Sequence, residues 1–393
     1  MSHQLISRNP DLKRLRDEGY DIDVISRKYL LIKNVPYVNA SKEIKRGILV
    51  SELALAGDDT IQPNTHVAYF IGEHPCNADG SLIEQIKHGS GKQQLDQDLT
   101  VDHSFSAKPK PQNVYRDYHH KMETYVAIIS GAAEAIDPSV TSRIFPVIQC
   151  SEDESVFKYA DTASSRAGID VVTRKLEIGK VAIVGLGGSG SYVLDLIAKT
   201  PIGEIHLFDG DSFVNHNAFR SPGAPSIEQL RNRPPKVTYF RDMYSNMRRK
   251  IVAHEYYLDA TNINALDIMD FVFLCFDRPD AKEHVIGRLV QLGKPFIDVG
   301  MGVQLINQSL LGVLRVTTST ANKRDHLQQR LSFEEAFVKN EYGRNIQIAD
   351  LNALNAALAV VKWKKLYGFY IDLEKEHFSA YTIDGNNLRN EDH

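Results

Sequence analysis

The sequence has little cysteine: 3 residues in 393, with no pair spaced as Cys-x-x-Cys. This scarcity indicates a reducing compartment and excludes a four-cysteine zinc site. No apolar run approaches the roughly 20 residues that cross a bilayer, and the N-terminal segment has no apolar secretion core. We therefore expect a cytoplasmic protein that does not enter a membrane.

An excess of charge of one sign is also missing. Basic and acidic residues nearly balance, giving a formal net charge of −4, and 42% of the residues are hydrophobic. This balance argues against a dedicated nucleic-acid-binding protein. The length of 393 residues is enough for two domains, each with its own core.

The segment from Lys180 to Arg220 is the most informative part of the sequence. It reads KVAIVGLGGSGSYVLDLIAKTPIGEIHLFDGDSFVNHNAFR. A short β-branched run predicts a strand over 181–184, the glycines predict a turn, and the apolar spacing over 191–199 predicts a helix. A second strand is expected over 204–208, ending at an aspartate. This order is the first half of a nucleotide-binding βαβ unit, in which glycine amides and a helix N-terminus contact phosphate.

Composition divides the whole chain into three parts. We expect an α+β domain over 1–150, a polar linker over 151–175 and a nucleotide-binding domain over 176–393. Within the first domain, a helix is expected over 115–133 and an exposed polar loop over 89–97. Each large part is long enough to form a separate core.

The nucleotide-binding domain continues as alternating strands and helices. Further strands are expected over 271–276, 295–299, 310–316 and either 237–240 or 251–254. A charged crossing segment over 317–345 leads to an amphipathic helix over 346–367, and residues 386–393 are expected to be frayed. The alternation predicts a doubly wound Rossmann-like α/β fold, with a mostly parallel sheet and helices on both faces.

Polar side chains follow these strands in an order that suggests triphosphate chemistry. In chain order they are Asp209, Asp211, Asn217, Arg220, Lys236 and Asp277. A hydride-transfer site has little use for two cations and a second carboxylate at one nucleotide. A site that splits a triphosphate uses them all, because cations neutralise phosphate charge, a carboxylate holds Mg²⁺ and another acid binds the ribose.

Taken together, the motifs GLGGSGS, HLFDGDSFVNHNAFR, PPKV and CFDRPDAK resemble the adenylation domain of ubiquitin-activating-type enzymes. That family includes the ThiF- and MoeB-like sulfur-carrier adenylyltransferases, and the resemblance covers about 176–368. It implies a homodimeric enzyme that uses ATP and Mg²⁺ to adenylate the C-terminal glycine of a ubiquitin-like or sulfur-carrier protein, releasing pyrophosphate. The implied setting is a bacterial ubiquitin-like conjugation pathway.

The resemblance also implies residue roles. The nucleotide would be bound by Gly185, Gly187, Gly188, Gly190, Asp209, Asp211, Asn217, Arg220 and Lys236. Among these, Gly188 would lie against the adenosine and Asp209 would bind the ribose hydroxyls. Asn217 and Arg220 match the family's Asn-x-x-Arg and would contact the phosphates.

Four residues are implied in catalysis: Arg166, Arg220, Lys236 and Asp277. Lys236 matches the family lysine that balances charge as pyrophosphate leaves, and Asp277 matches the Mg²⁺ ligand. Arg166, in the expected linker, is our candidate for an arginine that reaches a neighbouring site. Each also has a structural interpretation, as a capping residue, a packing residue or a surface charge.

The sequence departs from the family in its cysteines. Paired zinc-binding CxxC motifs are missing, so no structural metal is expected, and 317–345 has no cysteine to accept the carrier as a thioester. Cys275 falls in a predicted buried strand, whereas Cys76 and Cys150 are open as nucleophiles or as incidental thiols. An oxyester is possible in principle on Thr317, Thr318, Ser319 or Thr320, although no activating base is evident.

The N-terminal domain resembles an uncharacterised domain found ahead of bacterial activating-enzyme domains. The resemblance rests on VPYVNASKEIKRGILVSELALAGDDT, HVAYFIGEHPCNADGS and DHSFSAKP. His66, His74, Cys76 and His103 are possible ligands, but none is spaced as a zinc pair. We expect this domain to bind the carrier or a conjugating-enzyme partner.

Two other functions stay open. A nicotinamide-dependent Rossmann oxidoreductase would need a nicotinamide half-site and a proton donor, for which the sequence offers no clear candidate. A non-catalytic scaffold of the same fold would bind partners only. Preference for MgATP over NAD(H), and pyrophosphate exchange, would separate the three.

Overall fold

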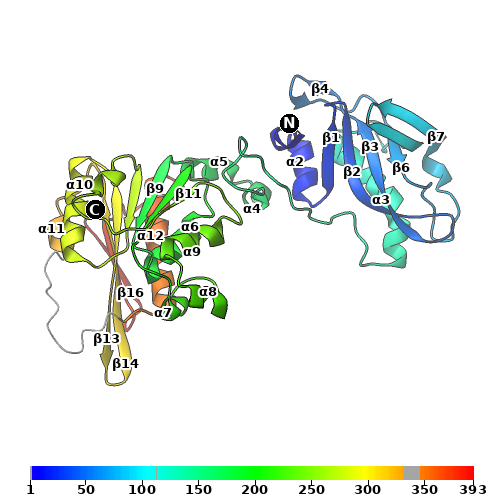
Figure 1. Ribbon diagram of the computed structural model, residues 1–393. Coiled ribbons are helices and arrows are strands. Elements are labelled where there is room, and N and C mark those ends of the chain that lie inside the picture. The colour runs from blue at the N-terminus through cyan, green and yellow to red at the C-terminus, as the bar shows by residue number, and fades with distance from the viewer. Residues whose placement is uncertain (1, 112, 332–345) are drawn as a thin grey trace. The chain divides into compact units, whose positions relative to one another are not determined.

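The computed structural model describes residues 2–111, 113–331 and 346–393 (Figure 1). These residues form two compact units. The N-terminal unit contains Met1–Cys150 and Ala160–Ala167, and the C-terminal unit contains Ser151–Tyr159 and Gly168–His393. Each has its own hydrophobic core. The functional roles assigned to the three sequence ranges stay predictions.

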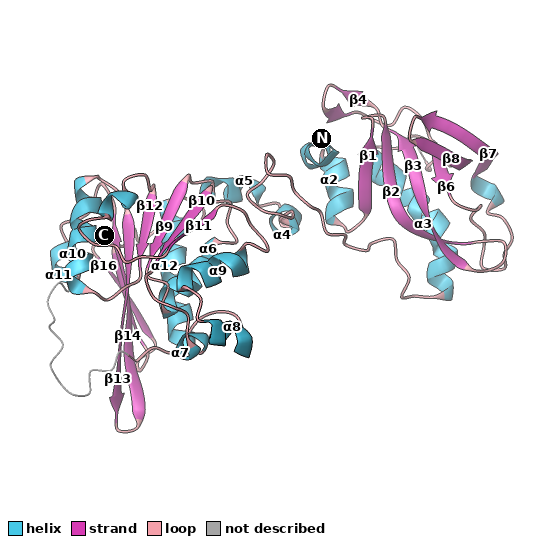
Figure 2. Ribbon diagram, viewed as in Figure 1, coloured by secondary structure: helices cyan, strands magenta, loops and turns pink. Residues whose placement is uncertain are grey.

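The N-terminal unit is built on a six-stranded antiparallel sheet of order β1-β2-β3-β6-β8-β7 (Figure 2). The strands are β1 (Asp21–Ile25), β2 (Tyr29–Val38), β3 (Ile44–Glu52), β6 (Val67–Ile71), β7 (Lys87–Asp96) and β8 (Leu99–Ser106), beside the short β4 (Leu55–Ala56) and β5 (Asp59–Thr60). The helices are α1 (Ser2–Arg8), α2 (Pro10–Asp17), α3 (Tyr118–Ile136) and α4 (Thr162–Arg166). Apolar residues of α1, α2 and α3 share one core with the sheet.

Helix α3 confirms the helix predicted over 115–133, with its start moved to Tyr118. The start is fixed by Asp117, whose side chain accepts a hydrogen bond from the His120 amide at 2.7 Å. The loop predicted over 89–97 is wrong, because this segment is strand β7. Its side chains are mostly exposed on both faces, so it lacks the alternation that identifies a strand, and it forms through pairing with β8.

The C-terminal unit is built on an eight-stranded sheet of order β11-β10-β9-β12-β13-β14-β15-β16. The strands are β9 (Lys180–Val184), β10 (Glu204–Phe208), β11 (Ile251–His254), β12 (Phe271–Leu274), β13 (Phe296–Ile306), β14 (Ser309–Ser319), β15 (Phe378–Thr382) and β16 (Asn387–Glu391). The strands from β11 to β13 are parallel and the last three are antiparallel. This central β9 with strands added on both sides is the predicted doubly wound topology.

Helices cover both faces of this sheet. Alternate residues of β9 enter two different cores: Val181 and Ile183 pack with α6 (Gly188–Ile197), α9 (Lys236–Tyr244) and α12 (Ala349–Leu366). Ala182 and Val184 pack on the other side, with α10 (Pro279–Gln291) and α11 (Leu327–Arg330). The shorter helices are α5 (Asp170–Thr173), α7 (Asn215–Ala218) and α8 (Ile227–Asn232), with 3₁₀ turns at Glu84–Ile86, Arg174–Leu176 and Ile263–Leu266.

Several predicted segments need correction or completion. The run 237–240 lies in α9, so the open choice of strand falls on 251–254, which is β11. The end of the chain is not frayed as predicted, because 387–391 pairs with β15 as an edge strand. Part of the predicted crossing segment, 332–345, lies outside the described residues. Within the described ranges, the helices are too short or too polar to cross a membrane.

Candidate active site

A glycine turn joins β9 to α6 at the carboxyl edge of the parallel strands. Gly185 has φ of +89°, and a Cβ there would lie 2.5 Å from the Cys275 carbonyl oxygen. A Cβ on Gly190 would lie 1.9 Å from the Gly185 carbonyl oxygen. Side chains at both positions are therefore excluded by the backbone itself. Helix α6 begins at Gly188, earlier than predicted, because the glycines form its first turn.

Asp209, at the end of β10, holds this turn in place. Its Oδ2 accepts a hydrogen bond from the Leu186 amide at 2.7 Å, and its Oδ1 accepts one from the Asp211 amide at 2.8 Å. The side chain is buried, and this burial raises the pKa of Asp209 although Lys236 is nearby. Asp209 therefore links β10 to the glycine turn through a carboxylate that is costly to bury.

Lys236 provides the cation beside Asp209. It is the first residue of α9, and its Nζ lies 2.5 Å from Asp211 Oδ2 and 3.7 Å from Asp209 Oδ1. Burial raises the pKa of Asp211, but hydrogen bonds from Lys236 and Tyr257 outweigh it, so the net shift is downward. The charge of Lys236 is thus already balanced by two carboxylates.

Arg220 differs from Lys236 in having a polar atom without a partner. Its Nε is buried and makes no hydrogen bond within the described part of the chain. Burial lowers the pKa of Arg220 despite the opposing charges of Asp211 and Asp209. The Arg220 amide donates to the Asn217 carbonyl at 3.1 Å, and Asn217 Oδ1 accepts from the Val214 amide at 2.9 Å. Asn217 therefore shapes the turn from which Arg220 extends.

Asn352, on α12, connects Arg220 to the glycine turn and was missed by the sequence reasoning. Its Oδ1 accepts from Ser189 Oγ at 2.9 Å, and its Nδ2 lies 3.5 Å from the Arg220 carbonyl oxygen. A Cβ on Gly188 would lie 2.0 Å from Asn352 Nδ2. The residue is fully buried. The sequence offered no signal for it, because an asparagine in an amphipathic helix is unremarkable until the helix is placed beside the turn.

Asp277 lies on the other side of the glycine turn. It follows β12, is exposed, and lines a small cleft together with Gly187, Gly188, Ser189, Cys275, Val299, Met301 and Gln347. The sequence reasoning also missed an ion pair: Lys282 Nζ is 2.6 Å from Asp298 Oδ1, and both side chains are nearly buried. The structure thus brings Asp209 and Lys236 to one side of the turn and Asp277 to the other. The charge of Arg220 interacts with Asp211 and Asp209 on the first of these sides.

Arg166 is the candidate catalytic residue that lies outside the C-terminal unit. It is the last residue of α4 and belongs to the N-terminal unit. There its guanidinium carbon lies 5.4 Å from the centre of the Phe145 ring. Its predicted role in catalysis stays a prediction.

Two of the three cysteines, Cys76 and Cys275, are poorly placed for nucleophilic chemistry. Burial raises the pKa of Cys275 and of Cys76, which keeps both thiols protonated at neutral pH. Cys76 is fully buried, and its Sγ donates to the His74 carbonyl at 3.3 Å. Cys150 is half-buried.

Two of the histidines considered as possible ligands in the sequence, His74 and His103, lie side by side. Their rings meet edge to face, with centroids 5.0 Å apart.

The structure identifies a base beside one of the candidate hydroxyls. Thr320 Oγ1 lies 3.2 Å from His377 Nε2, and His377 Nδ1 lies 3.1 Å from the Lys375 carbonyl oxygen. However, the preceding Ser319 pairs with Phe296, the first residue of β13. Because β13 runs parallel to β9, Thr320 lies at the edge of the sheet opposite the glycine turn. Thr317, Thr318 and Ser319 are buried.

Comparisons with known proteins cover both units. Residues 160–339 match the ThiF family, and residues 10–162 match a domain of unknown function, DUF6791. Ubiquitin-like modifier-activating enzyme 5 of Gallus gallus is 26% identical over 158 residues, which cover 37% of this chain and 39% of that protein. The Xenopus laevis enzyme is 24% identical over the same shares. The match therefore spans about two fifths of these relatives.

Two solved structures align with this chain at low sequence identity. The crystal structure of E. coli MccB with ATP aligns with a TM-score of 0.46 and 19% identity, covering 59% of this chain and 69% of that one. The crystal structure of PaaA aligns with a TM-score of 0.46 and 18% identity, covering 73% of this chain and 91% of that one.

Proposed function

Because residues 160–339 form a ThiF-family domain, we propose that the C-terminal unit uses MgATP to adenylate the C-terminal glycine of a ubiquitin-like or sulfur-carrier protein. The family and the activating-enzyme relatives support the adenylyltransferase class. The observation that carries the proposal is the convergence of Asp209 and Asp277 on one glycine turn, with the charge of Arg220 acting on Asp209 and Asp211. The carrier, the metal and each residue's role are part of the proposal.

The phosphates would be bound by backbone amides and by Arg220. The N-terminus of α6 begins inside the glycine turn and presents amides and a positive dipole end. The unpartnered Nε of Arg220 adds a fixed cation nearby. Lys236 is paired with Asp211 and Asp209, so we assign it first to holding those carboxylates and second to balancing charge on the departing pyrophosphate.

The ribose would be bound by Asp209. Each of its oxygens accepts one backbone hydrogen bond, which leaves a lone pair on each for a ribose hydroxyl. Asp277 is exposed in the cleft beside the turn, where a carboxylate fits a Mg²⁺ ion. When bound there, Mg²⁺ would neutralise charge on the triphosphate.

The reaction needs no nucleophile from this chain. An oxygen of the carrier's terminal carboxylate attacks the α-phosphorus and forms a new P–O bond. The bond from that phosphorus to the oxygen bridging to the β-phosphate breaks, and pyrophosphate leaves with the electron pair. Protein groups contribute position and charge. The protonated thiols of Cys275 and Cys76 agree with a reaction that ends at the acyl-adenylate.

The partners of the enzyme are also proposed. The name of the activating-enzyme relative supports a ubiquitin-like carrier. We assign the N-terminal unit to binding that carrier or a conjugating-enzyme partner, and we expect a cytoplasmic homodimer within a bacterial conjugation pathway. Nucleic acid has no place in this scheme, given the net charge of −4.

Pyrophosphate exchange into ATP tests the proposal. The assay would use the full chain and any small glycine-ending protein that is found encoded beside it, with the same protein lacking its final glycine as control. Exchange that depends on the terminal glycine is expected. A thermal-shift assay with MgATP and with NAD(H) separates the alternatives: an oxidoreductase prefers NAD(H), and a scaffold shows no exchange with any glycine-ending neighbour.

A further inference from the structure

The segment that leads into α12 carries a polar side chain that the proposed binding of MgATP does not use. Gln347 lies just before this helix and lines the small cleft beside the glycine turn, together with Asp277 and Met301. We propose that Gln347 binds the terminal glycine of the carrier, by accepting a hydrogen bond from the peptide N–H of that glycine. This inference rests on the proposed function and names the residue that holds its second substrate.

Two buried asparagines of α12 hold the start of this helix against both walls of the cleft. Asn352 Oδ1 accepts a hydrogen bond from Ser189 Oγ, in the glycine turn, at 2.9 Å. Asn355 Nδ2 donates to the carbonyl oxygen of Gly300 at 2.8 Å. Gly300 belongs to β13, and its two neighbours in that strand line the cleft. The position of Gln347 in the cleft is therefore set by the packing of α12.

A buried oxygen of Gln347 is the observation that points to a ligand. Gln347 Oε1 is buried and has no hydrogen-bond partner among the residues that the structure describes. Buried side-chain polar atoms in folded proteins are nearly always bonded, and an unpaired one is costly. A ligand that brings a donor into the cleft would remove this cost. An amide oxygen accepts hydrogen bonds and does not donate them, so the matching ligand group is an N–H or an O–H.

The nucleotide is poorly suited to supply that donor. Among the bases and phosphates of ATP, the N–H groups belong to the adenine amino group, which is joined to the ribose. The proposed ribose ligand, Asp209, and the proposed Mg²⁺ ligand, Asp277, lie on opposite sides of the glycine turn. Gln347 shares the Asp277 side, where the phosphates would lie. The carrier's carboxylate has to approach the α-phosphate there, and the donor nearest to that carboxylate is the peptide N–H of the same glycine.

An uncharged acceptor suits this place. The carrier's terminal carboxylate and the triphosphate are anions, and a glutamate at position 347 would repel both. Gln347 accepts the N–H without adding charge, and the bond would orient the carboxylate toward the phosphorus. If the side-chain amide is turned the other way, Gln347 Nε2 would donate to a phosphate oxygen, and the residue would be a ligand of the nucleotide instead. The two arrangements differ in whether Gln347 affects the affinity for MgATP.

Isothermal titration of the full chain with three small molecules tests the contact without a carrier protein. The first is MgATP. The second is adenosine joined through a 5′-sulfamate to acetyl-Gly-Gly, a stable mimic of the acyl-adenylate. The third is the same compound with N-methylglycine as its last residue, which lacks the N–H. Wild type should bind the third compound about tenfold more weakly than the second. Methylation of the first glycine nitrogen instead is the control and should leave the affinity unchanged.

The variant Gln347→Met removes the acceptor from the protein side. It should bind the acetyl-Gly-Gly compound about tenfold more weakly than wild type, lose no further affinity when the last glycine is N-methylated, and bind MgATP as wild type does. Gln329→Met replaces an exposed glutamine of α11 and should behave as wild type. Circular dichroism would confirm that both variants are folded, and the comparison of ligands on wild type does not depend on any variant.

Four results would overturn the inference. They are equal affinities of wild type for the glycine and N-methylglycine compounds, a Gln347→Met variant that still distinguishes them, weaker binding of MgATP by that variant, and a wild type that binds MgATP but not the acetyl-Gly-Gly compound. In the first, second and fourth cases the proposed function stands, because MgATP is still bound. Failure of wild type to bind MgATP would overturn the proposed function and this inference with it.

Discussion

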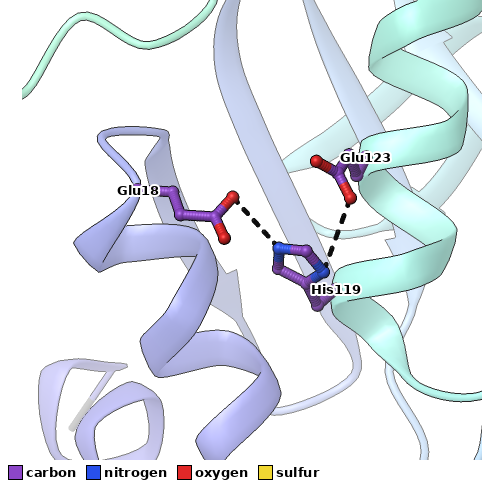
Figure 3. Close-up of side chains that lie close together, drawn as sticks. All are labelled: Glu18, His119 and Glu123. Atoms are coloured by element: carbon purple, nitrogen blue, oxygen red, sulfur yellow. Dashed lines mark hydrogen bonds and ion pairs between the residues drawn. The ribbon is translucent and has the colours of Figure 1, made fainter. Parts of the chain in front are cut away.

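Each of the two units brings charged side chains together, at the glycine turn in the C-terminal unit and around His119 in the N-terminal unit. Only the arrangement in the C-terminal unit could be predicted from the sequence. In the C-terminal unit, Asp209 and Asp277 follow parallel strands, and the carboxyl ends of such strands meet at one edge. In the N-terminal unit, Glu18 directly follows α2 and His119 lies in α3 (Figure 3), 101 positions later, with the antiparallel strands between them in the sequence. Parallel topology converts chain order into proximity, whereas antiparallel packing does not.

A second contrast lies within the active site. Lys236 is buried against two carboxylates, whereas Arg220 has a buried nitrogen without a partner. The first arrangement stabilises the site, and the second leaves charge for a ligand. The predictions below test this division between structural and ligand-binding charges, from the largest expected effect to the smallest.

Asp277→Ala should reduce pyrophosphate exchange on the order of 10³-fold, because it removes the proposed Mg²⁺ ligand. The melting temperature should change little, since Asp277 is exposed. The matched control is Asp280→Ala, an exposed aspartate in the first turn of α10, which should retain exchange. Full activity of Asp277→Ala would remove the metal assignment.

Arg220→Ala should slow exchange by about 10²-fold, because a cation near the phosphates is lost at the transition state. The guanidinium makes no ion pair within 4.0 Å among the described residues, so stability should be nearly unchanged. Arg231→Ala, an exposed arginine of α8, is the control. A large loss of stability with unchanged exchange would show that Arg220 is structural.

Lys236→Met should lower the free energy of unfolding by about 2 kcal/mol at neutral pH, because Asp209 stays buried without its cation. The pKa of Asp209 is already raised and should rise further. A carboxyl with a raised pKa stabilises the fold at low pH and loses that contribution as pH rises through its folded value. The deficit should therefore be larger at about pH 8 than at about pH 5.

The fluorescence of Trp363, the single tryptophan and a core residue of the C-terminal unit, reports this unfolding. Lys199→Met, which breaks the exposed pair with Asp195, should cost at most about 0.5 kcal/mol. A deficit of Lys236→Met that does not vary with pH would contradict the assignment to Asp209.

Lys121→Met should stabilise the N-terminal unit by about 1 kcal/mol at neutral pH. Lys121 is fully buried, its Nζ donates to the Val67 carbonyl at 2.7 Å, and burial lowers its pKa to about 8. The folded state holds fewer protons than the unfolded state from about pH 8 to about 10.4, so wild-type stability rises across that window. The methionine variant should lack this rise.

Hydrogen exchange of the α3 amides at several pH values measures this effect in the N-terminal unit. Lys92→Met replaces an exposed lysine of β7 and should retain the wild-type slope. A Lys121→Met variant that is less stable than wild type at neutral pH would show that the bond to Val67 outweighs desolvation of the ammonium group.

The sequence predicted the parts of the fold that have local patterns. Strands β9 and β10 lie where their apolar runs placed them, and α12 falls within the predicted 346–367. Strands β7 and β16 were missed because they are polar edge strands, formed by pairing with a neighbour rather than by burial. The run 237–240 was ambiguous because a short apolar segment fits a strand or a buried helix.

The candidate site divides in the same way. Asp209, Lys236 and Asp277 could be proposed because each follows a recognisable segment. Asn352 and the Lys282–Asp298 pair could not, because their importance depends on how α12, α10 and β13 pack beside the glycine turn. The buried His119 cluster has no motif, so it becomes visible when α2 and α3 are placed together.

The account rests on the claim that the glycine turn and Arg220 bind a triphosphate. Isothermal titration of MgATP into wild type, Arg220→Ala and Arg231→Ala, with NADH as the competing ligand, tests this without any carrier protein. We predict saturable binding of MgATP by wild type and Arg231→Ala, about tenfold or more weaker binding by Arg220→Ala, and no comparable binding of NADH. Equal affinities of the three proteins for MgATP, or a preference for NADH, would contradict it.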